Sequence, residues 1–434
     1  MIRGRLLVAL FIAAATPACG GGDGATPTRP PAHAVSASGC SPVSYGGEGR
    51  ADLLVVASTV LQGAYSSHGV QIAQALKLVL EQRNWRAGHY DVALQVCDET
   101  TPTSDVSDPA TCRRHARAFA RNRTVVAVAG AWGSSCTAAM LPILNRAPNG
   151  PLVAISGSSS YLGLTRPGPG VGPGEPQRYA PAGRPAFVRL TPADDVQGAA
   201  AAVFAQRGGA RRAFVLNDRE PYGSGVAEAF RAAAGRSRVR VVGTGTWDGR
   251  AGNYHELSDQ VRRARPDVVY LGGYLSSNGG RLIADLRRAL GSRARLIGPD
   301  GFAAPSQLVE GAGRAAENFT WTIPVVPNEE LPQAGRDLAA DFDERFGSRP
   351  CCYSVHAAQS MSMILDAISD SDGSRAEVSD KLLHARVKGG YLGDFGIDSH
   401  GDTTLNRMGV YVVRDGRQHF ESTVTPPAAL LSRR

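Results

Sequence analysis

Two features that would mark a membrane-embedded or nucleic-acid-binding protein are scarce in this chain of 434 residues. No apolar run reaches the roughly 20 residues that a membrane-spanning helix needs, so we expect the body of the chain to be soluble. Lysine is rare: of the 47 basic residues, only Lys77, Lys381 and Lys388 are lysines. The many arginines are scattered among acids without a reader motif, so the net charge of +8 predicts no nucleic-acid partner.

Metal-binding spacings are absent as well. The sequence has no Cys-x-x-Cys and no Cys/His pair at zinc spacing, so it predicts no metal site and no cofactor. Apart from Cys19 the cysteines are even in number, and an exported chain tends to oxidise them, with many connectivities open. Adjacent Cys351 and Cys352 can form a strained vicinal bridge or pair elsewhere. The cysteines besides Cys19 are Cys40, Cys97, Cys112, Cys136, Cys351 and Cys352.

No catalytic motif stands out. An α/β hydrolase would carry Gly-x-Ser-x-Gly after a strand, with an acid and a histidine following in the chain. Residues 223–225 and 157–159 resemble this pattern but lack its spacing, and no nucleophile–base pair is evident. We therefore expect a protein that is not an enzyme.

The first 19 residues have the order of a bacterial export signal. Two arginines precede the apolar run 6–15, and small residues lead to Cys19, which glycines follow. This order predicts a lipoprotein signal peptide over residues 1–19, acylation of Cys19, and attachment to the outer face of the cytoplasmic membrane. Plain secretion into the periplasm, after cleavage near Ala18, is the alternative. Residues 20–49 are predicted to form a flexible tether.

Beyond the tether, short strand patterns alternate with amphipathic helical patterns. Continuous apolar runs such as residues 125–128 are typical of strands buried on both faces, hence of parallel sheets. The alternation and the length predict an α/β fold with two doubly wound parallel-sheet lobes. Strands are predicted over residues 52–57, 91–96, 124–129, 151–156, 212–217, 239–244, 267–272, 295–298 and 409–414. Helices are predicted over residues 70–83, 108–121, 194–207, 223–235, 254–264, 277–290, 333–346, 354–369 and 375–386.

We expect the chain to cross between the lobes in a three-strand hinge. The predicted lobe 1 comprises residues 50–190 and 325–400, and the predicted lobe 2 comprises residues 191–324 and 401–422. Hinges are predicted near residues 190–191, 322–325 and 398–402. Between the two strand sets, residues 161–186 are rich in glycine and proline; such a long loop is either functional or a surface excursion.

Three segments that follow predicted strands carry candidate binding groups, because ligands of open α/β sheets bind beyond the carboxyl ends of strands. In residues 130–140, Ser134 and the free N–H groups of a helix start can bind an anion, although simple helix capping is the alternative. Residues 155–161 offer hydroxyls and carbonyls, or a plain turn. Asp300, in the Pro-Asp-Gly turn, suits an ammonium group but is also ordinary turn chemistry. The candidate aromatic residues are Trp132, Tyr222 and Tyr274, each of which alone is as compatible with a core or a surface position.

Taken together, these segments resemble the branched-chain amino-acid class of type I periplasmic binding proteins of ABC transporters. The similarity runs over residues 52–414 and rests on the stretches 125–137, 151–160, 215–227, 268–280, 297–301 and 393–402. The resemblance implies the type I binding-protein fold, a monomer, an ABC permease as partner and an amino acid as ligand.

The resemblance also implies a role for each matching residue. Ser134 would bind the ligand carboxylate, and the Ser160 hydroxyl both carboxylate and ammonium. The Ser158 carbonyl and Asp300, which precedes Gly301 in the same motif, would take the ammonium. Tyr222 and Tyr274 would line the second lobe.

This sequence departs from the family pattern at several of these positions. Ser160 stands for the usual threonine, Asp300 for glutamate, and Trp132 for a smaller aliphatic residue that bounds the side-chain pocket. The resemblance further implies a disulfide between Cys97 and Cys136. Amides, urea and aromatic acids remain alternative cargoes, and a sensor-linked binding protein remains an alternative to transport.

Overall fold

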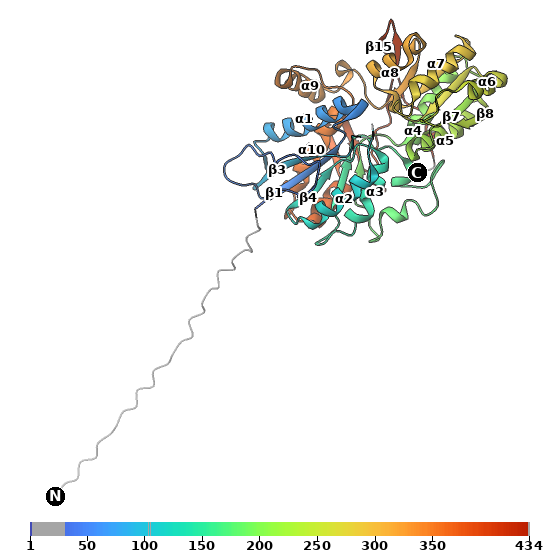
Figure 1. The fold of residues 1–434 in the computed structure, drawn as a ribbon. Helices are drawn as coiled ribbons and strands as arrows, with labels where there is room; N and C mark the ends of the chain where they lie inside the picture. The colour runs from blue at the N-terminus through green and yellow to red at the C-terminus, as the bar shows by residue number, and fades with distance from the viewer. Residues whose placement is uncertain (2–30, 103, 105, 433–434) are drawn as a thin grey trace. The chain divides into compact units, whose positions relative to one another are not determined.

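The computed structural model describes residues 1, 31–102, 104 and 106–432 (Figure 1). These residues fall into two units, Met1–Pro30 and Pro31–Arg434, and the fold lies in the second. The predicted signal peptide and Cys19 lie outside the described residues. Within the described part, every helix is too short or too polar to cross a membrane.

The first sheet has six strands in the order β2-β3-β1-β4-β5-β6. Neighbouring strands are parallel, except for the antiparallel pair β2 and β3. The strands are β1 (Leu53–Thr59), β2 (Arg86–Ala87), β3 (Tyr90–Asp98), β4 (Val125–Ala129), β5 (Val153–Ser156) and β6 (Phe187–Arg189). The helices that accompany this sheet are α1 (Ser66–Gln82), α2 (Pro109–Arg121), α3 (Ser134–Leu144), α9 (Gln333–Phe346), α10 (Ser354–Ser369) and α11 (Arg375–Leu383).

The second sheet has seven strands in the order β15-β14-β11-β10-β9-β7-β8. The five strands β11, β10, β9, β7 and β8 are parallel to their neighbours. The strands β14 and β15 are antiparallel additions at the β11 edge. Its strands are β7 (Arg212–Asn217), β8 (Arg240–Thr246), β9 (Val268–Gly272), β10 (Arg295–Gly298), β11 (Thr320–Ile323), β14 (Met408–Arg414) and β15 (Arg417–Val424). Its helices are α4 (Asp194–Arg207), α5 (Pro221–Arg236), α6 (His255–Ala264), α7 (Gly279–Leu290) and α8 (Pro305–Ala312).

Alternate residues of each central strand face different helix layers. Leu53 and Val55 of β1 belong to a core with α1 and α10, whereas Leu54 and Val56 belong to a core with α2 and α3. The same alternation along β7 places α4 and α5 on one face and α6 and α7 on the other. This two-sided burial explains the continuous apolar strands and confirms the predicted fold class.

Part of the predicted tether is ordered on the edge of the first sheet. The backbone of Ser44 exchanges hydrogen bonds with Leu94 of β3, and the Val35 N–H donates to the buried Gln95 side chain at 2.7 Å. Cys40 is disulfide-bonded to Cys97 at the end of β3. Residues 31–49 therefore extend the sheet instead of forming free coil.

The disulfide implied by the family resemblance is wrong. Cys97 pairs with Cys40, and Cys136 pairs with Cys112. Cys112 and Cys136 lie in the first turns of α2 and α3, which pack against each other on one face of the sheet. Cys351 and Cys352 are free thiols, with their sulfurs 2.9 Å apart.

The chain passes between the two sheets three times. It runs from β6 to β7, from β11 to α9, which packs on α1 and α10, and from the hairpin β12 (Arg386–Gly390) and β13 (Gly393–Gly396) to β14. The predicted hinges near residues 190–191, 322–325 and 398–402 fall at these passages. Movement about them stays a prediction.

A buried ion network joins two of these crossovers. Asp402 accepts from Arg189 Nε and from Arg166 Nε, each at 2.8 Å, and Arg166 also reaches Asp195 at the start of α4 at 2.9 Å. All four side chains are at most 5% exposed. Although burial opposes ionisation, the two arginines lower the pKa of Asp402 to about 2. Because Arg166 comes from the 161–186 segment, that insertion is part of the crossover.

We expect Asp402→Asn to destabilise the protein by about 3–5 kcal/mol, because it leaves two buried guanidinium groups without their shared carboxylate. Urea unfolding measures the change. Asp394→Asn, which removes an exposed partner of Lys388, is the control and should leave the stability nearly unchanged, because exposed ion pairs contribute little. Equal stability of the two variants would show that the network does not support the crossovers.

Peptide mapping after alkylation without reduction should find Cys351 modified, because its thiol is exposed. The same digest should contain two linked peptide pairs, Cys40 with Cys97 and Cys112 with Cys136. A peptide that links Cys97 to Cys136 would contradict the structure.

Candidate functional site

Ser134 is the first residue of α3, and Gly133 is the N-cap. The Ser134 hydroxyl makes no capping hydrogen bond; it accepts the N–H of Tyr161 at 3.2 Å, across the turn that follows β5. Simple helix capping therefore does not explain this serine. The contact brings two predicted segments, 130–140 and 155–161, together at the carboxyl ends of β4 and β5.

Glu99, which sequence analysis missed, shapes the turn before α3. Its fully buried carboxylate accepts the N–H groups of Trp132 and Gly133 at 3.1 and 2.9 Å and the Ser58 hydroxyl at 2.9 Å. The Ser107 hydroxyl is a fourth donor. Burial raises the pKa of Glu99 in spite of these donors. Its position just after β3 was the one sequence signal that could have identified it.

The serines after β5 occupy different environments. The Ser158 hydroxyl donates to the Trp132 carbonyl at 2.9 Å. The Ser160 hydroxyl is buried and has no hydrogen-bond partner among the described residues. The carbonyls of Ser160 and Tyr161 accept from Arg189 Nη1 at 2.9 and 2.8 Å, which ties this turn to the ion network.

Asp300 lies across from these serines, after β10 of the second sheet. Its Oδ1 accepts from Tyr222 Oη at 2.5 Å and from Gln197 Nε2 at 2.7 Å, and its Oδ2 accepts from Tyr353 Oη. Burial raises the pKa of Asp300. Tyr353 follows the crossover from the second sheet and precedes α10, so residues from both sheets meet at this carboxylate.

Gly301 admits no side chain. A Cβ at this position would lie 2.2 Å from the carbonyl oxygen of Gly273. The Gly301 carbonyl accepts from Tyr65 Oη at 2.6 Å, and its N–H donates to Tyr222 Oη at 3.2 Å. The glycine is needed for this close approach between the β9 and β10 turns.

Asp194 is the second residue that sequence analysis missed. It begins α4, is fully buried, and neither of its carboxylate oxygens has a hydrogen-bond partner among the described residues. Ser160 lies beside it without a hydrogen bond of ordinary geometry, and Gln197, one turn along α4, holds Asp300. Burial and the nearby Asp300 raise the pKa of Asp194 to about 8. The pair of acids at the predicted helix start was an available signal.

Aromatic rings from both sheets meet beside these polar groups. The Tyr65 centroid lies 5.0 Å from that of Trp132 and 6.2 Å from that of Tyr274, and Trp132 and Tyr274 are 6.2 Å apart. Tyr222 packs on Tyr274 at 4.8 Å. The structure therefore groups the three predicted aromatic residues, and it adds Tyr65.

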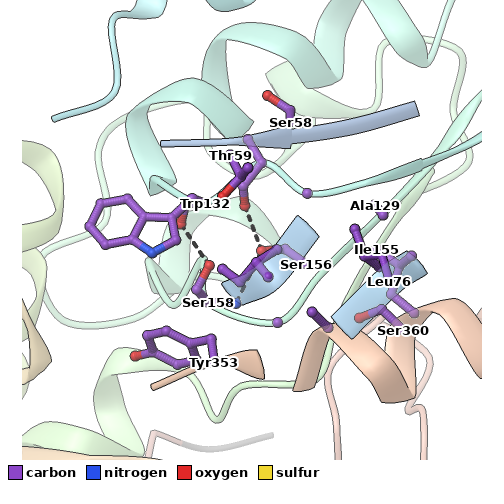
Figure 2. A pocket seen from close by; sticks show the side chains of 15 residues that line it. Ser58, Thr59, Leu76, Ala129, Trp132, Ile155, Ser156, Ser158, Tyr353 and Ser360 are labelled. Carbon is purple, nitrogen blue, oxygen red and sulfur yellow. Dashed lines mark hydrogen bonds between the residues drawn. The ribbon is translucent and has the colours of Figure 1, made fainter. Parts of the chain in front are cut away.

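A small pocket with a cavity volume of about 20 Å³ lies next to Trp132, at the carboxyl ends of β1, β4 and β5 (Figure 2). Its walls are mainly apolar, and Figure 2 shows Trp132 and Tyr353 on one side of it and Leu76 and Ile155 on the other. Of the predicted polar site residues, Ser158, which belongs to the turn after β5, is the one that lines this pocket.

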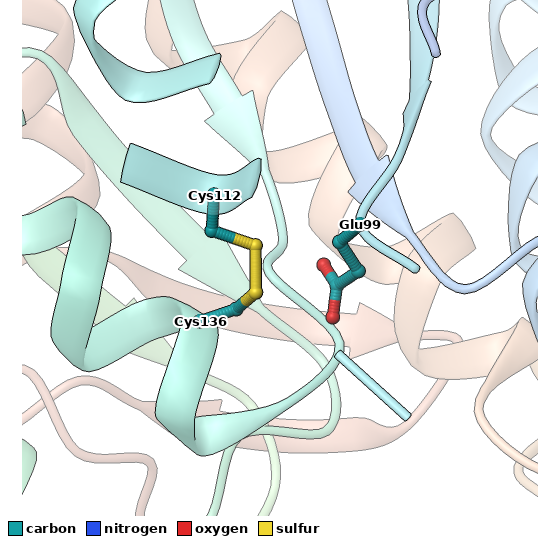
Figure 3. Close-up of side chains that lie close together, drawn as sticks. All are labelled: Glu99, Cys112 and Cys136. Carbon is teal, nitrogen blue, oxygen red and sulfur yellow. A yellow bond between two sulfur atoms is a disulfide. The ribbon is translucent and has the colours of Figure 1, made fainter. Parts of the chain in front are cut away.

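The described residues contain one group of side chains that could suggest a metal site: Glu99, Cys112 and Cys136, whose ligand atoms lie within 4.8 Å of one another. Figure 3 shows that the two sulfurs are bonded to each other. Since the carboxylate is also occupied by backbone and hydroxyl donors, this group is a structural support of the turn.

Replacing Asp194 by asparagine should change how stability depends on pH. The pKa of Asp194 is 3.8 for an exposed carboxyl group and about 8 in the fold. Its contribution to the free energy of unfolding is therefore fully present at acidic pH and is lost as the pH rises through about 8. Asp194→Asn should therefore gain melting temperature over the wild type progressively between about pH 4 and pH 8. The exposed Asp259→Asn is the control. If the melting temperatures of all three proteins change with pH in parallel, Asp194 does not have the raised pKa.

The sequence model of the periplasmic binding protein family matches residues 55–418. A Leu/Ile/Val-binding protein homolog 1 of Brucella abortus is 26% identical over 374 residues, 84% of this chain and 91% of that relative. A leucine-, isoleucine-, valine-, threonine-, and alanine-binding protein of Pseudomonas aeruginosa is 25% identical over 210 residues, 48% of this chain and 55% of that protein. The chain thus matches about half the length of the Pseudomonas protein.

Solved structures share the fold. The leucine binding protein LivK of Thermotoga maritima has a TM-score of 0.72 at 21% identity, covering 86% of this chain and 99% of that one. A solute binding protein of R. palustris in complex with benzoate has a TM-score of 0.68 at 16% identity, covering 86% and 96%. Proteins of this family and fold bind solutes and are not enzymes. This chain belongs to the periplasmic binding protein family.

Proposed function

We propose that this chain is the binding protein of an ABC importer and captures an α-amino acid between its two sheets. The observation that carries the proposal is the fully buried carboxylate of Asp194, with the half-buried Asp300 nearby and a Ser160 hydroxyl that has no partner among the described residues. A buried acid beside a second acid is costly to ionise unless a cation joins them. A ligand ammonium group supplies that cation.

In this proposal the ligand carboxylate binds at the start of α3. The first N–H groups of α3 and the Ser134 hydroxyl lie at the carboxyl ends of β4 and β5, and the positive end of a helix favours a carboxylate. An amino acid could then pair both of its charges at once, Ser134 with the carboxylate and Asp300, Asp194, Ser160 and the Ser158 carbonyl with the ammonium.

The proposal includes export and delivery. The leader over residues 1–19 supports transport across the cytoplasmic membrane, and acylation of Cys19 would hold the protein at its outer face. Membership in this family, whose relatives include Leu/Ile/Val-binding proteins, supports delivery of the cargo to a permease.

An aromatic acid is the second candidate ligand. The ring cluster favours it, and two structural neighbours were solved with benzoate and 4-hydroxybenzoate. Against it stand Asp194 and Asp300, since an acid without an ammonium group would bring a further negative charge to a fully buried and a half-buried carboxyl group.

A thermal-shift screen of the amino acids identifies the ligand, and titration calorimetry then compares variants. Asp300→Asn should weaken binding by about 2–5 kcal/mol, because it removes one partner of a buried charge pair. Ser134→Ala should weaken it by about 1 kcal/mol, the value of one hydrogen bond. Asp259→Asn, on the exposed face of α6, is the control. Unchanged affinity in Asp300→Asn and Ser134→Ala would disprove the site.

A further inference from the structure

The ring cluster of Tyr65, Trp132 and Tyr274 closes the space beside the proposed amino-acid site. Tyr65 precedes α1 and Trp132 precedes α3 in the first lobe, whereas Tyr274 follows β9 in the second. Their centroid separations of 5.0 to 6.2 Å are those of rings in van der Waals contact. No aliphatic branch fits between rings at these separations, because the tilted and edge-on rings already touch one another.

Each ring is held in place by its own backbone or hydroxyl contact. Glu99 accepts the Trp132 N–H, and Asp218 accepts the Tyr274 N–H at 2.9 Å. The Tyr65 hydroxyl donates to the Gly301 carbonyl. The bonds of Trp132 and Tyr274 fix the backbone from which each ring projects, and moving the Tyr65 ring would break its own buried hydrogen bond, so the cluster resists a bulky side chain.

The other sides of the proposed head-group site are also occupied. Asp194 and Arg189 close it toward the crossovers, and Tyr353 closes it toward α10 through Asp300. A side chain on the ligand's α-carbon therefore has to face the rings.

We propose that this cluster restricts the ligand to an amino acid with a very small side chain, of the size of glycine or alanine, and that Trp132 excludes branched aliphatic side chains. This inference rests on the proposed amino-acid function. It differs from what the names of the Leu/Ile/Val-binding relatives would suggest for this chain.

The pocket behind Trp132 could accommodate a branched ligand side chain if the indole ring were removed. Trp132 lines this pocket as well as the ring cluster, and Ile72, Leu76 and Ile155 form aliphatic walls behind it (Figure 2). The indole N–H has no hydrogen-bond partner among the described residues. Trp132→Leu would therefore join the pocket to the ligand site without leaving a polar partner unsatisfied.

Calorimetric titrations with glycine, L-alanine and L-leucine test the inference in the full chain. The wild type should bind glycine or alanine at least about tenfold more tightly than leucine, and Trp132→Leu should reverse this order. Asp259→Asn, on the exposed face of α6 and away from the ring cluster, is the control. It should continue to prefer the small amino acids.

The outcomes separate this inference from the function on which it rests. If the wild type binds leucine as tightly as alanine, the size limit is overturned and the amino-acid function stands. If no amino acid binds to the wild type or to Trp132→Leu, both are overturned. Because the wild-type comparison needs no variant, a folding defect in Trp132→Leu leaves the decision intact.

Discussion

The contact on which the site depends is the carboxylate of Asp402 between the guanidinium groups of Arg189 and Arg166. It ties the last crossover to the end of β6 and to the inserted segment 161–186. Arg189 also holds the carbonyls of Ser160 and Tyr161, and the Tyr161 N–H donates to Ser134. One buried ion network therefore positions the turn after β5 against the start of α3, and with it every first-lobe group of the proposed site.

Two buried aspartates in this region have pKa values shifted in opposite directions. Asp402, between two arginines, has a pKa lowered to about 2 and stabilises the fold at neutral pH. Asp194, fully buried beside Asp300, has a pKa raised to about 8 and destabilises its own ionised form. The first carboxylate has its cations within the chain, whereas we propose that the second pairs with the ammonium group of a ligand. A binding protein gains from this arrangement, because the ligand relieves a cost that the ligand-free fold carries.

Much of the fold was predictable because its signals are local. The runs at 125–128 and 268–272 are apolar throughout, so they indicated parallel strands with helices on both faces. Short elements such as β6 and α8 were not predicted, because three strand residues or two helical turns are too few to show a hydrophobic period. The strand β14 was predicted without its antiparallel direction, because a strand pattern does not reveal the direction of its neighbour, and β15 was not predicted.

The sequence by itself determined the alternation of strands and helices, the motif segments at the strand ends, and the family to which they point. Those features depend on hydrophobic period and on turn chemistry within a few residues. Only the tertiary structure decided the cysteine pairs, the burial of Asp194 without a hydrogen bond of ordinary geometry among the described residues, the support of Trp132 by Glu99, and the contact of three rings from two lobes. Each of these joins residues far apart in the chain, and no local spacing specifies which distant group a buried side chain meets.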